Sequence, residues 1–246
     1  MVRAQDIGFD VSATPFYLAH QGLNERDTEE LLYDVYSVLC PSLLHFAPHL
    51  NAKRTQPSAV SVSPARGLGA GAGAGADILT LRIGFVSTYF HDHSIGRILF
   101  ETIFQLQKFA QSGAFYESFG SRYTLELFVF EIDNSIVLDE SGGEVRVVDK
   151  REDMVNKGLQ ELLGDHYIRI HKGVGTSGIL GIREVLESTR LDVLLFPDIG
   201  MDFVTYLLAF GRYASIQVSR HIAPCAFLCC AARSLNTLRR CAATGG

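Results

Sequence analysis

Long apolar runs are missing from this chain of 246 residues. No stretch reaches the roughly 18 apolar residues that a membrane-spanning helix needs. Met1 is not followed by the charged and apolar regions of a signal peptide. We therefore expect no membrane partner and an intracellular location, either cytoplasmic or nucleocytoplasmic.

Positive charge is scarce as well. The 22 Lys and Arg residues are outnumbered by 27 Asp and Glu residues, which gives a net charge of −5. Because proteins that bind nucleic acids neutralise phosphates with a basic surface, this balance argues against nucleic acid as a partner. With 47% hydrophobic residues, the composition is that of a globular protein with one large core or two modest ones.

Cysteine is nearly absent until the end of the chain. Of five cysteines, only Cys40 lies outside the last 22 residues, so we expect no distributed disulfide framework and a reducing compartment. The cysteines of residues 220–246 contain no C-x2-C pair, the spacing on which structural zinc sites depend. The sequence therefore predicts no bound metal and no cofactor.

Strand and helix patterns alternate over most of the chain. An apolar run with β-branched members at 81–86 predicts a strand buried on both faces. Apolar residues spaced by three and four predict a helix over 95–110. The same reasoning gives further strands at 123–130, 166–171, 191–196 and 215–219, and helices at 153–163, 177–189 and 203–210. This alternation predicts an α/β fold, a single Rossmann-like lobe with a parallel sheet, over residues 81–219.

Three other segments differ from this lobe in composition. Residues 1–51 are expected to be a helical segment, with an apolar stripe from Leu31 to Leu39 that Pro41 ends. Residues 52–80 are rich in Ser, Pro, Ala and Gly and read as a linker or insertion, because they bury too little apolar surface to offset the entropy of ordering. Residues 220–246 form a divergent tail that contains Cys and Arg.

Polar residues gather where the first predicted strand gives way to its helix. His91, Asp92 and His93 follow the strand directly, and Ser94 is placed to cap the helix. Ligands of α/β proteins bind at the carboxyl ends of strands, and free N–H groups at a helix start favour anions. This is the best candidate site in the chain, although His93 could also be a loop histidine bonded to a backbone carbonyl.

A second loop, residues 197–202, should converge on the same edge of the sheet. Asp198 is its candidate ligand-binding residue, and the alternative is a helix N-cap or turn residue. Residues 173–178 spell G-x-G-x-x-G, and Asp198 lies 20 residues beyond the last of these glycines. That spacing satisfies the dinucleotide fingerprint and leaves an NAD(P)-binding oxidoreductase as one alternative, but the motif follows the third strand rather than the first.

The most specific signal lies in three longer stretches: RIGFVSTYFHDHSIGR, LDVLLFPDIGMDFVTYLLAFGRYASIQVS and FYLAHQGLNERDTEELL. The first two resemble the amino-terminal catalytic lobe of the protein O-GlcNAc transferase and Spindly family. The third is similar to the segment that joins this lobe to upstream tetratricopeptide repeats. The resemblance covers residues 15–219, with the linker as an insertion.

The resemblance implies half of a two-lobe GT-B glycosyltransferase. Such an enzyme is inverting and metal-independent, and it transfers N-acetylglucosamine from UDP-GlcNAc, or a sugar from a related nucleotide, to Ser or Thr hydroxyls of protein acceptors. His93 falls on the family's acceptor-side histidine, as a base or positioning group for the acceptor hydroxyl. Asp92, Asp198 and Gly200 are implied to bind substrate, and Gln217 matches a glutamine of the family's strand.

The chain also departs from the family. Ser215 stands where the family usually has proline, and residues 220–223 replace the Gly-rich turn expected after Ser219. Because the nucleotide sugar is held by the second lobe, we expect this chain to be a fragment that is inactive alone. The alternative is a non-catalytic protein-interaction module derived from the same family.

Overall fold

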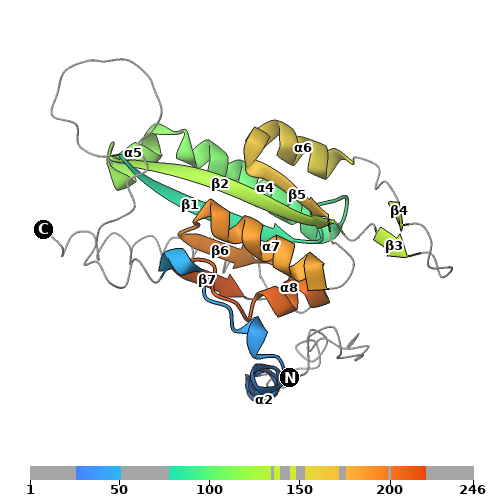
Figure 1. The fold of residues 1–246 in the computed structure, drawn as a ribbon. Helices are drawn as coiled ribbons and strands as arrows, with labels where there is room; N and C mark the ends of the chain where they lie inside the picture. The colour runs from blue at the N-terminus through green and yellow to red at the C-terminus, as the bar shows by residue number, and fades with distance from the viewer. Residues whose placement is uncertain are drawn as a thin grey trace, which may run out of the picture.

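The computed structural model describes residues 26–50, 78–133, 136–138, 145–147, 153–171, 176–198 and 201–219. The linker residues 52–77, the tail 220–246, the glycines of 173–175 and Gly200 lie outside the described residues. The described part forms an α/β lobe around one five-stranded sheet, with a helical segment packed against it (Figure 1).

The central sheet is parallel throughout, as the sequence predicts. Its strands lie in the order β5-β2-β1-β6-β7. Their bounds are β1 Leu79–Ser87, β2 Tyr123–Asp133, β5 Tyr167–His171, β6 Val193–Phe196 and β7 Ile216–Ser219. β1 starts inside the range assigned to the linker, because Leu79 and Thr80 pair with the first residues of β2.

The strand order reverses between β1 and β6. From β1 the chain adds β2 and then β5 on one side, and it afterwards returns to the other side of β1 to add β6 and β7. Ligands of doubly wound α/β proteins bind outside the carboxyl ends of the strands at such a switch point. The fold therefore indicates that a ligand would bind at the segments that follow β1 and β6.

Helices cover both faces of the sheet (Figure 1). One face carries α4 Ser94–Ala110, α5 Gly113–Phe119 and α6 Met154–Leu163, and the other carries α7 Thr176–Thr189 and α8 Phe203–Leu208. Successive residues of β1 show how the faces separate, since Phe85 packs with the α4 and α6 side and Val86 with the α7 and α8 side. Both faces of the sheet are thus buried, which explains why Ile83, Phe85 and Val86 in the second half of β1 are all apolar and buried.

Short elements complete the described lobe. The connection after β2 contains an antiparallel pair, β3 Ile136–Leu138 and β4 Val145–Val147. The 3-10 helix η2, Gly164–His166, leads from α6 into β5.

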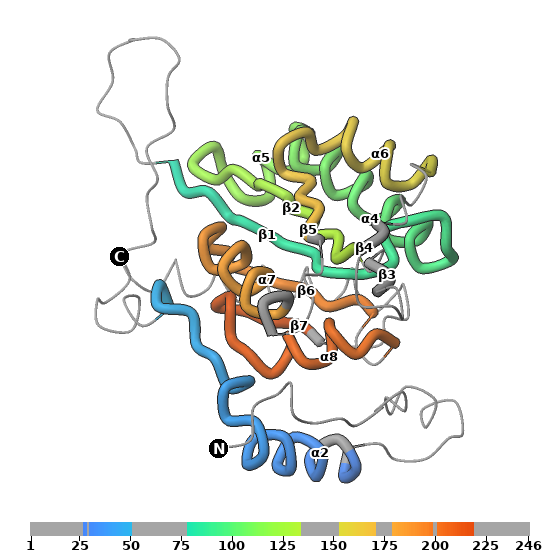
Figure 2. The backbone as a smooth tube through the Cα atoms, turned by 45° about the vertical axis from the view of Figure 1, so that its right-hand side comes forward, coloured from blue at the N-terminus to red at the C-terminus, as the bar shows by residue number. Residues whose placement is uncertain are grey.

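The helical segment consists of α2 Arg26–Leu39 and the 3-10 helix η1 Pro41–Leu43. Figure 2 shows α2 outside the two helical layers, below the half of the lobe that contains β7 and α8. Tyr36 and Leu43 of the segment pack against Tyr206 and Leu207 of α8. Most of the predicted apolar stripe does not reach this contact, and the side chains of Leu31 and Val38 are 64% and 80% exposed.

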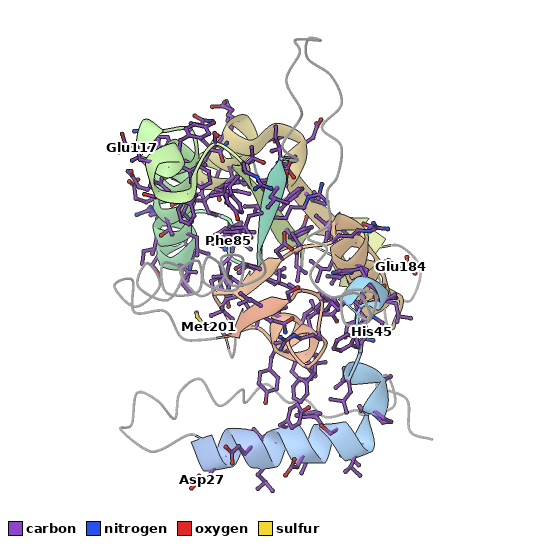
Figure 3. The ribbon with its side chains drawn as sticks, turned by 90° about the vertical axis from the view of Figure 1, so that its left-hand side faces the viewer. Asp27, His45, Phe85, Glu117, Glu184 and Met201 are labelled. Carbon is purple, nitrogen blue, oxygen red and sulfur yellow. The ribbon has the colours of Figure 1, made fainter. Side chains whose placement is uncertain are left out.

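Residues 42–47 fasten the helical segment to the lobe. The Ala47 N–H donates to the Arg212 carbonyl at 2.8 Å, and the Arg212 N–H donates to the His45 carbonyl at 2.7 Å. The buried Arg183 donates from Nη1 to the Ser42 carbonyl at 2.8 Å, and Nε2 of His45 lies against the Glu187 carboxylate. Figure 3 shows His45 at the point where the chain passes from α2 to the lobe.

Candidate functional site

The candidate site is built on the loop between β1 and α4. Helix α4 begins at Ser94, and its N-cap is His93, with φ −134° and ψ 157°. Nδ1 of His93 accepts the Ile95 backbone N–H at 3.3 Å. The expected cap at Ser94 is therefore wrong by one residue, because the imidazole takes the role that a short hydroxyl side chain usually has.

This capping bond has a chemical consequence for His93. A ring nitrogen that accepts a hydrogen bond carries no proton, so the neutral imidazole is the tautomer protonated at Nε2. In that form Nε2 donates a hydrogen bond and is not available to take a proton. Of the two roles that the resemblance implies for His93, the tautomer suits a positioning group better than a base.

Asp92 lies on the solvent side of the same loop. Its Oδ1 accepts a hydrogen bond from Arg97 Nε at 2.6 Å, and both side chains are exposed. The Arg97 guanidinium lowers the pKa of the Asp92 carboxyl through this bond and its charge, so Asp92 stays ionised at neutral pH. The Asp92 backbone N–H donates to Asp153, whose other oxygen caps α6, so the loop is tied to the start of a second helix.

Aromatic rings and a glycine hold the loop in place. The Tyr89 ring centroid lies 4.9 Å from that of His93 and 5.8 Å from that of His91. A Cβ atom on Gly96 would lie 2.1 Å from the His91 carbonyl oxygen and 2.5 Å from that of Tyr89. Only glycine lets the loop backbone pass this closely over the first turn of α4.

Asp198 lies two residues after the end of β6 and is almost completely buried, with 1% of its surface exposed. Its Oδ2 accepts hydrogen bonds from Ser87 Oγ at 2.9 Å, the Thr88 N–H at 3.0 Å and Thr88 Oγ1 at 3.3 Å. Oδ1 has no hydrogen-bond partner among the residues that the structure describes. Burial raises the pKa of the Asp198 carboxyl to about 6, and the negative charge of Asp202 adds to the rise.

The structure thus joins the loops after β1 and β6, which the sequence predicts to converge. Asp198 is not the cap of the next helix, because Asp202 caps α8 by accepting the N–H groups of Val204 and Thr205. Gly200 is outside the described residues. Gln217 has a structural role, since its side-chain amide donates to the carbonyls of Ala209 and Gly211.

The geometry counts against the dinucleotide alternative. The helix that follows the G-x-G-x-x-G sequence, α7, comes after β5, and β5 is an edge strand that does not border the switch point. A dinucleotide fingerprint also needs an acidic side chain that reaches the ribose. Asp198 instead points its Oδ2 at Ser87 and Thr88 and is buried.

Sequence reasoning missed a buried polar group beside this site. Glu131 of β2, next to Ser87 in the sheet register, is 1% exposed and accepts hydrogen bonds from Arg169 Nε at 2.9 Å and from the Tyr167 hydroxyl. Burial and the neighbouring Glu131 carboxylate raise the pKa of Tyr167. The one available signal was an acidic residue at the end of an apolar strand.

The described residues contain neither a cluster of metal ligands nor a helix suited to crossing a membrane. None of their His, Cys, Asp and Glu side chains form a group of three or more that could hold a metal ion. None of the helices in the described ranges has the length and apolar character to cross a membrane.

No protein-family model matches the chain, and no curated protein matches it significantly. Among solved structures, a mutant of the O-GlcNAc transferase of Thermobaculum terrenum matches with a TM-score of 0.36 and 19% sequence identity, over 56% of this chain. The match covers 20% of the length of that protein.

Proposed function

We propose that this chain is the acceptor-side lobe of a protein O-glycosyltransferase, in which the loop from Tyr89 to His93 places the acceptor hydroxyl. The sequence resemblance supports this proposal. The structural observation that carries it is the switch point, where the loop after β1 and Asp198 after β6 meet at one edge of the sheet. That edge is where α/β proteins bind small ligands.

In the proposed reaction, the Ser or Thr oxygen of the acceptor attacks the anomeric carbon of the sugar. The bond from that carbon to the diphosphate breaks, the nucleoside diphosphate leaves, and the hydroxyl proton passes to the leaving phosphate or to water. His93 donates a hydrogen bond from Nε2 to an oxygen of the acceptor and so holds it on the sugar face opposite the diphosphate. N-acetylglucosamine on UDP is the proposed donor, held by a second lobe that is not among the described residues.

Transfer by the complete enzyme tests this proposal. The chain is joined to the donor lobe of a protein O-glycosyltransferase to give the complete enzyme, and labelled UDP-N-acetylglucosamine or GDP-fucose is supplied with a Ser/Thr peptide. We expect transfer, and we expect His93→Ala to lower kcat/KM at least about tenfold, since positioned polar groups typically contribute 10² to 10⁴-fold.

Two further variants separate chemistry from capping. Asn is a good N-cap residue, so His93→Asn should keep the capping bond to Ile95 and the melting temperature but not the activity. His166→Ala, a change in η2, should leave transfer unaltered. Full activity of His93→Asn would exclude the proposed role of the imidazole.

A non-catalytic interaction module is the second candidate, and the exposed apolar residues of α2 favour it. Leu31, Tyr33, Val35 and Val38 are all exposed on this helix. Exposed apolar surface of this kind is typical of protein interaction sites. If the complete protein binds partner proteins through α2 but transfers no sugar, and Leu31→Glu abolishes that binding, the second candidate is the correct one.

A further inference from the structure

The buried carboxylate of Asp198 binds the end of β1. Three donors at Ser87 and Thr88 converge on a single oxygen of Asp198, which is 110 positions away from Thr88 in the chain. We propose that Asp198 is the positioning residue of the loop from Tyr89 to His93: through Ser87 it sets where the Tyr89 ring, and with it the His93 imidazole, lies. The importance of the His93 placement for catalysis rests on the proposed function. The structural effect of Asp198 on the loop does not depend on that function.

The route from Asp198 to the loop runs through one hydroxyl group. Ser87 Oγ donates its hydrogen to Asp198 Oδ2 at 2.9 Å and accepts the Tyr89 N–H at 2.9 Å. Because the hydroxyl has one hydrogen, its bond to the carboxylate directs its lone pairs toward the Tyr89 N–H. Removal of the carboxylate frees the hydroxyl to rotate and weakens its hold on Tyr89.

The loop has little freedom to absorb such a change. On one side, the Tyr89 and His91 carbonyls lie against the backbone of Gly96 in α4. On the other side, the Tyr89 ring contacts the imidazole of His93. A shift of the Tyr89 backbone therefore displaces the Tyr89 ring relative to His93, because neither side of the loop is free to move.

Asp198 acts through one of its two oxygens. All three hydrogen bonds from the end of β1 go to Oδ2, while Oδ1 has no partner among the described residues. An amide at this position keeps an acceptor oxygen where Oδ2 lies and puts its NH2 group where Oδ1 lies. Asp198→Asn should therefore keep the loop in place, and Asp198→Ala should release it.

Asp192 provides a matched control at the opposite end of the same strands. It lies just before β6, and its Oδ2 accepts the backbone N–H of Arg82 in β1 at 3.1 Å. It is thus another aspartate that links the β6 and β1 segments, but it is remote from the loop. Asp192→Ala should destabilise the lobe without moving His93.

The experiment is NMR of the full chain labelled with ¹³C at Cε1 of histidine. The His93 signal reports its distance from the Tyr89 ring through the ring current. His166, whose ring lies 4.2 Å from that of Phe128, is an internal reference with the same kind of aromatic contact. We expect Ser87→Ala and Asp198→Ala to shift the His93 signal and leave that of His166 in place, and Asp198→Asn and Asp192→Ala to leave both unchanged.

Ser87→Ala is the deciding variant, because it removes one hydroxyl group and leaves the Thr88 bonds to Asp198. An unmoved His93 signal in folded Ser87→Ala, or an equal shift in Asp192→Ala, would overturn the proposal. In the complete enzyme, Ser87→Ala should also lower kcat. Failure of sugar transfer in the unaltered complete enzyme would reject the proposed function and leave the NMR result standing, so the two proposals can fail separately.

Discussion

The buried carboxyl of Asp198 should make the stability of the lobe depend on pH in an unusual direction. Most carboxylates of folded proteins have lowered pKa values and stabilise the fold at neutral pH. Asp198 is the reverse case, because burial raises its pKa to about 6 from 3.8. Between these two values the folded chain holds a proton that the unfolded chain has released, so the free energy of unfolding falls as the pH rises.

The rise in pKa sets the size of the effect. A difference of about 2 pKa units corresponds to about 3 kcal/mol, gained in full below pH 4 and lost as the pH rises through about 6. Exposed carboxylates such as Asp92, whose pKa the Arg97 guanidinium lowers, act in the opposite direction. The contribution of Asp198 must therefore be measured as a difference between two proteins that share all other groups.

Asp198→Asn is the variant for this measurement, because the amide has the same shape and does not titrate. Urea unfolding of both proteins at pH 4 and pH 7.5 gives the free energy of unfolding of each. Between these pH values the wild-type chain should lose up to about 3 kcal/mol relative to Asp198→Asn. Ser87→Ala removes a bond that favours the ionised carboxylate, and it should make the decline steeper. A constant difference between wild type and Asp198→Asn would refute this reasoning.

Three other predictions concern packing, the attachment of α2 and activity. Gly96→Ala should destabilise the lobe by about 1–3 kcal/mol, because the new Cβ meets two carbonyl oxygens. Gly181→Ala should stabilise α7 by about 0.5–1 kcal/mol, because its Cβ meets nothing within 4 Å. Thermal unfolding of both variants would check this. Arg183→Met removes the donors to Tyr213 and Ser42, so limited proteolysis should release α2 faster and the free energy of unfolding should fall by about 1–3 kcal/mol. The chain by itself should transfer no sugar and bind UDP-N-acetylglucosamine more weakly than about 1 mM, which calorimetry would measure; turnover above background would contradict this.

The alternation of strands and helices was sufficient to predict the lobe. Each strand of the sheet was expected within a few residues of its place. The clearest case is β6, all of whose residues are apolar and buried, because a strand covered on both faces needs a continuous apolar run. The position of β1 in the middle of the sheet was not predicted. It depends on which side of β1 the chain returns to after β5, and a local pattern does not contain that information.

Helix α2 shows a second limit of local patterns. The stripe from Leu31 to Leu39 was correctly predicted to be helical, but among the side chains of this helix that the structure describes only Tyr36 is buried against the lobe. A helical period tells which residues share a face, and it does not tell what covers that face. The contact includes the rings of Tyr33 and Tyr36 in α2, whose centroids each lie 5.5 Å from that of Phe210, two residues after α8.

The candidate site was found because its residues are adjacent in the sequence. The contacts that hold the site in place were missed because they join residues that are far apart in the sequence. His91, Asp92 and His93 are consecutive, so a strand followed by a helix is enough to place them at the edge of the sheet. The cap was assigned to the wrong residue because cap preferences favour Ser94, whereas the His93 imidazole accepts the Ile95 N–H and is the cap.

Asp198 was given two local interpretations, a cap or a turn residue. Asp202 is the cap, whereas Asp198 does lie in a turn, and its carbonyl accepts the Met201 N–H at 2.9 Å. Its observed partners, Ser87 and Thr88, are 111 and 110 positions away. Such a contact forms only when β6 pairs with β1. It therefore depends on the arrangement of the sheet, and no single segment of sequence predicts it. A polar residue that ends a buried strand should therefore be tested against the ends of all other strands before a local role is assigned to it, because parallel strands bring these ends to one edge.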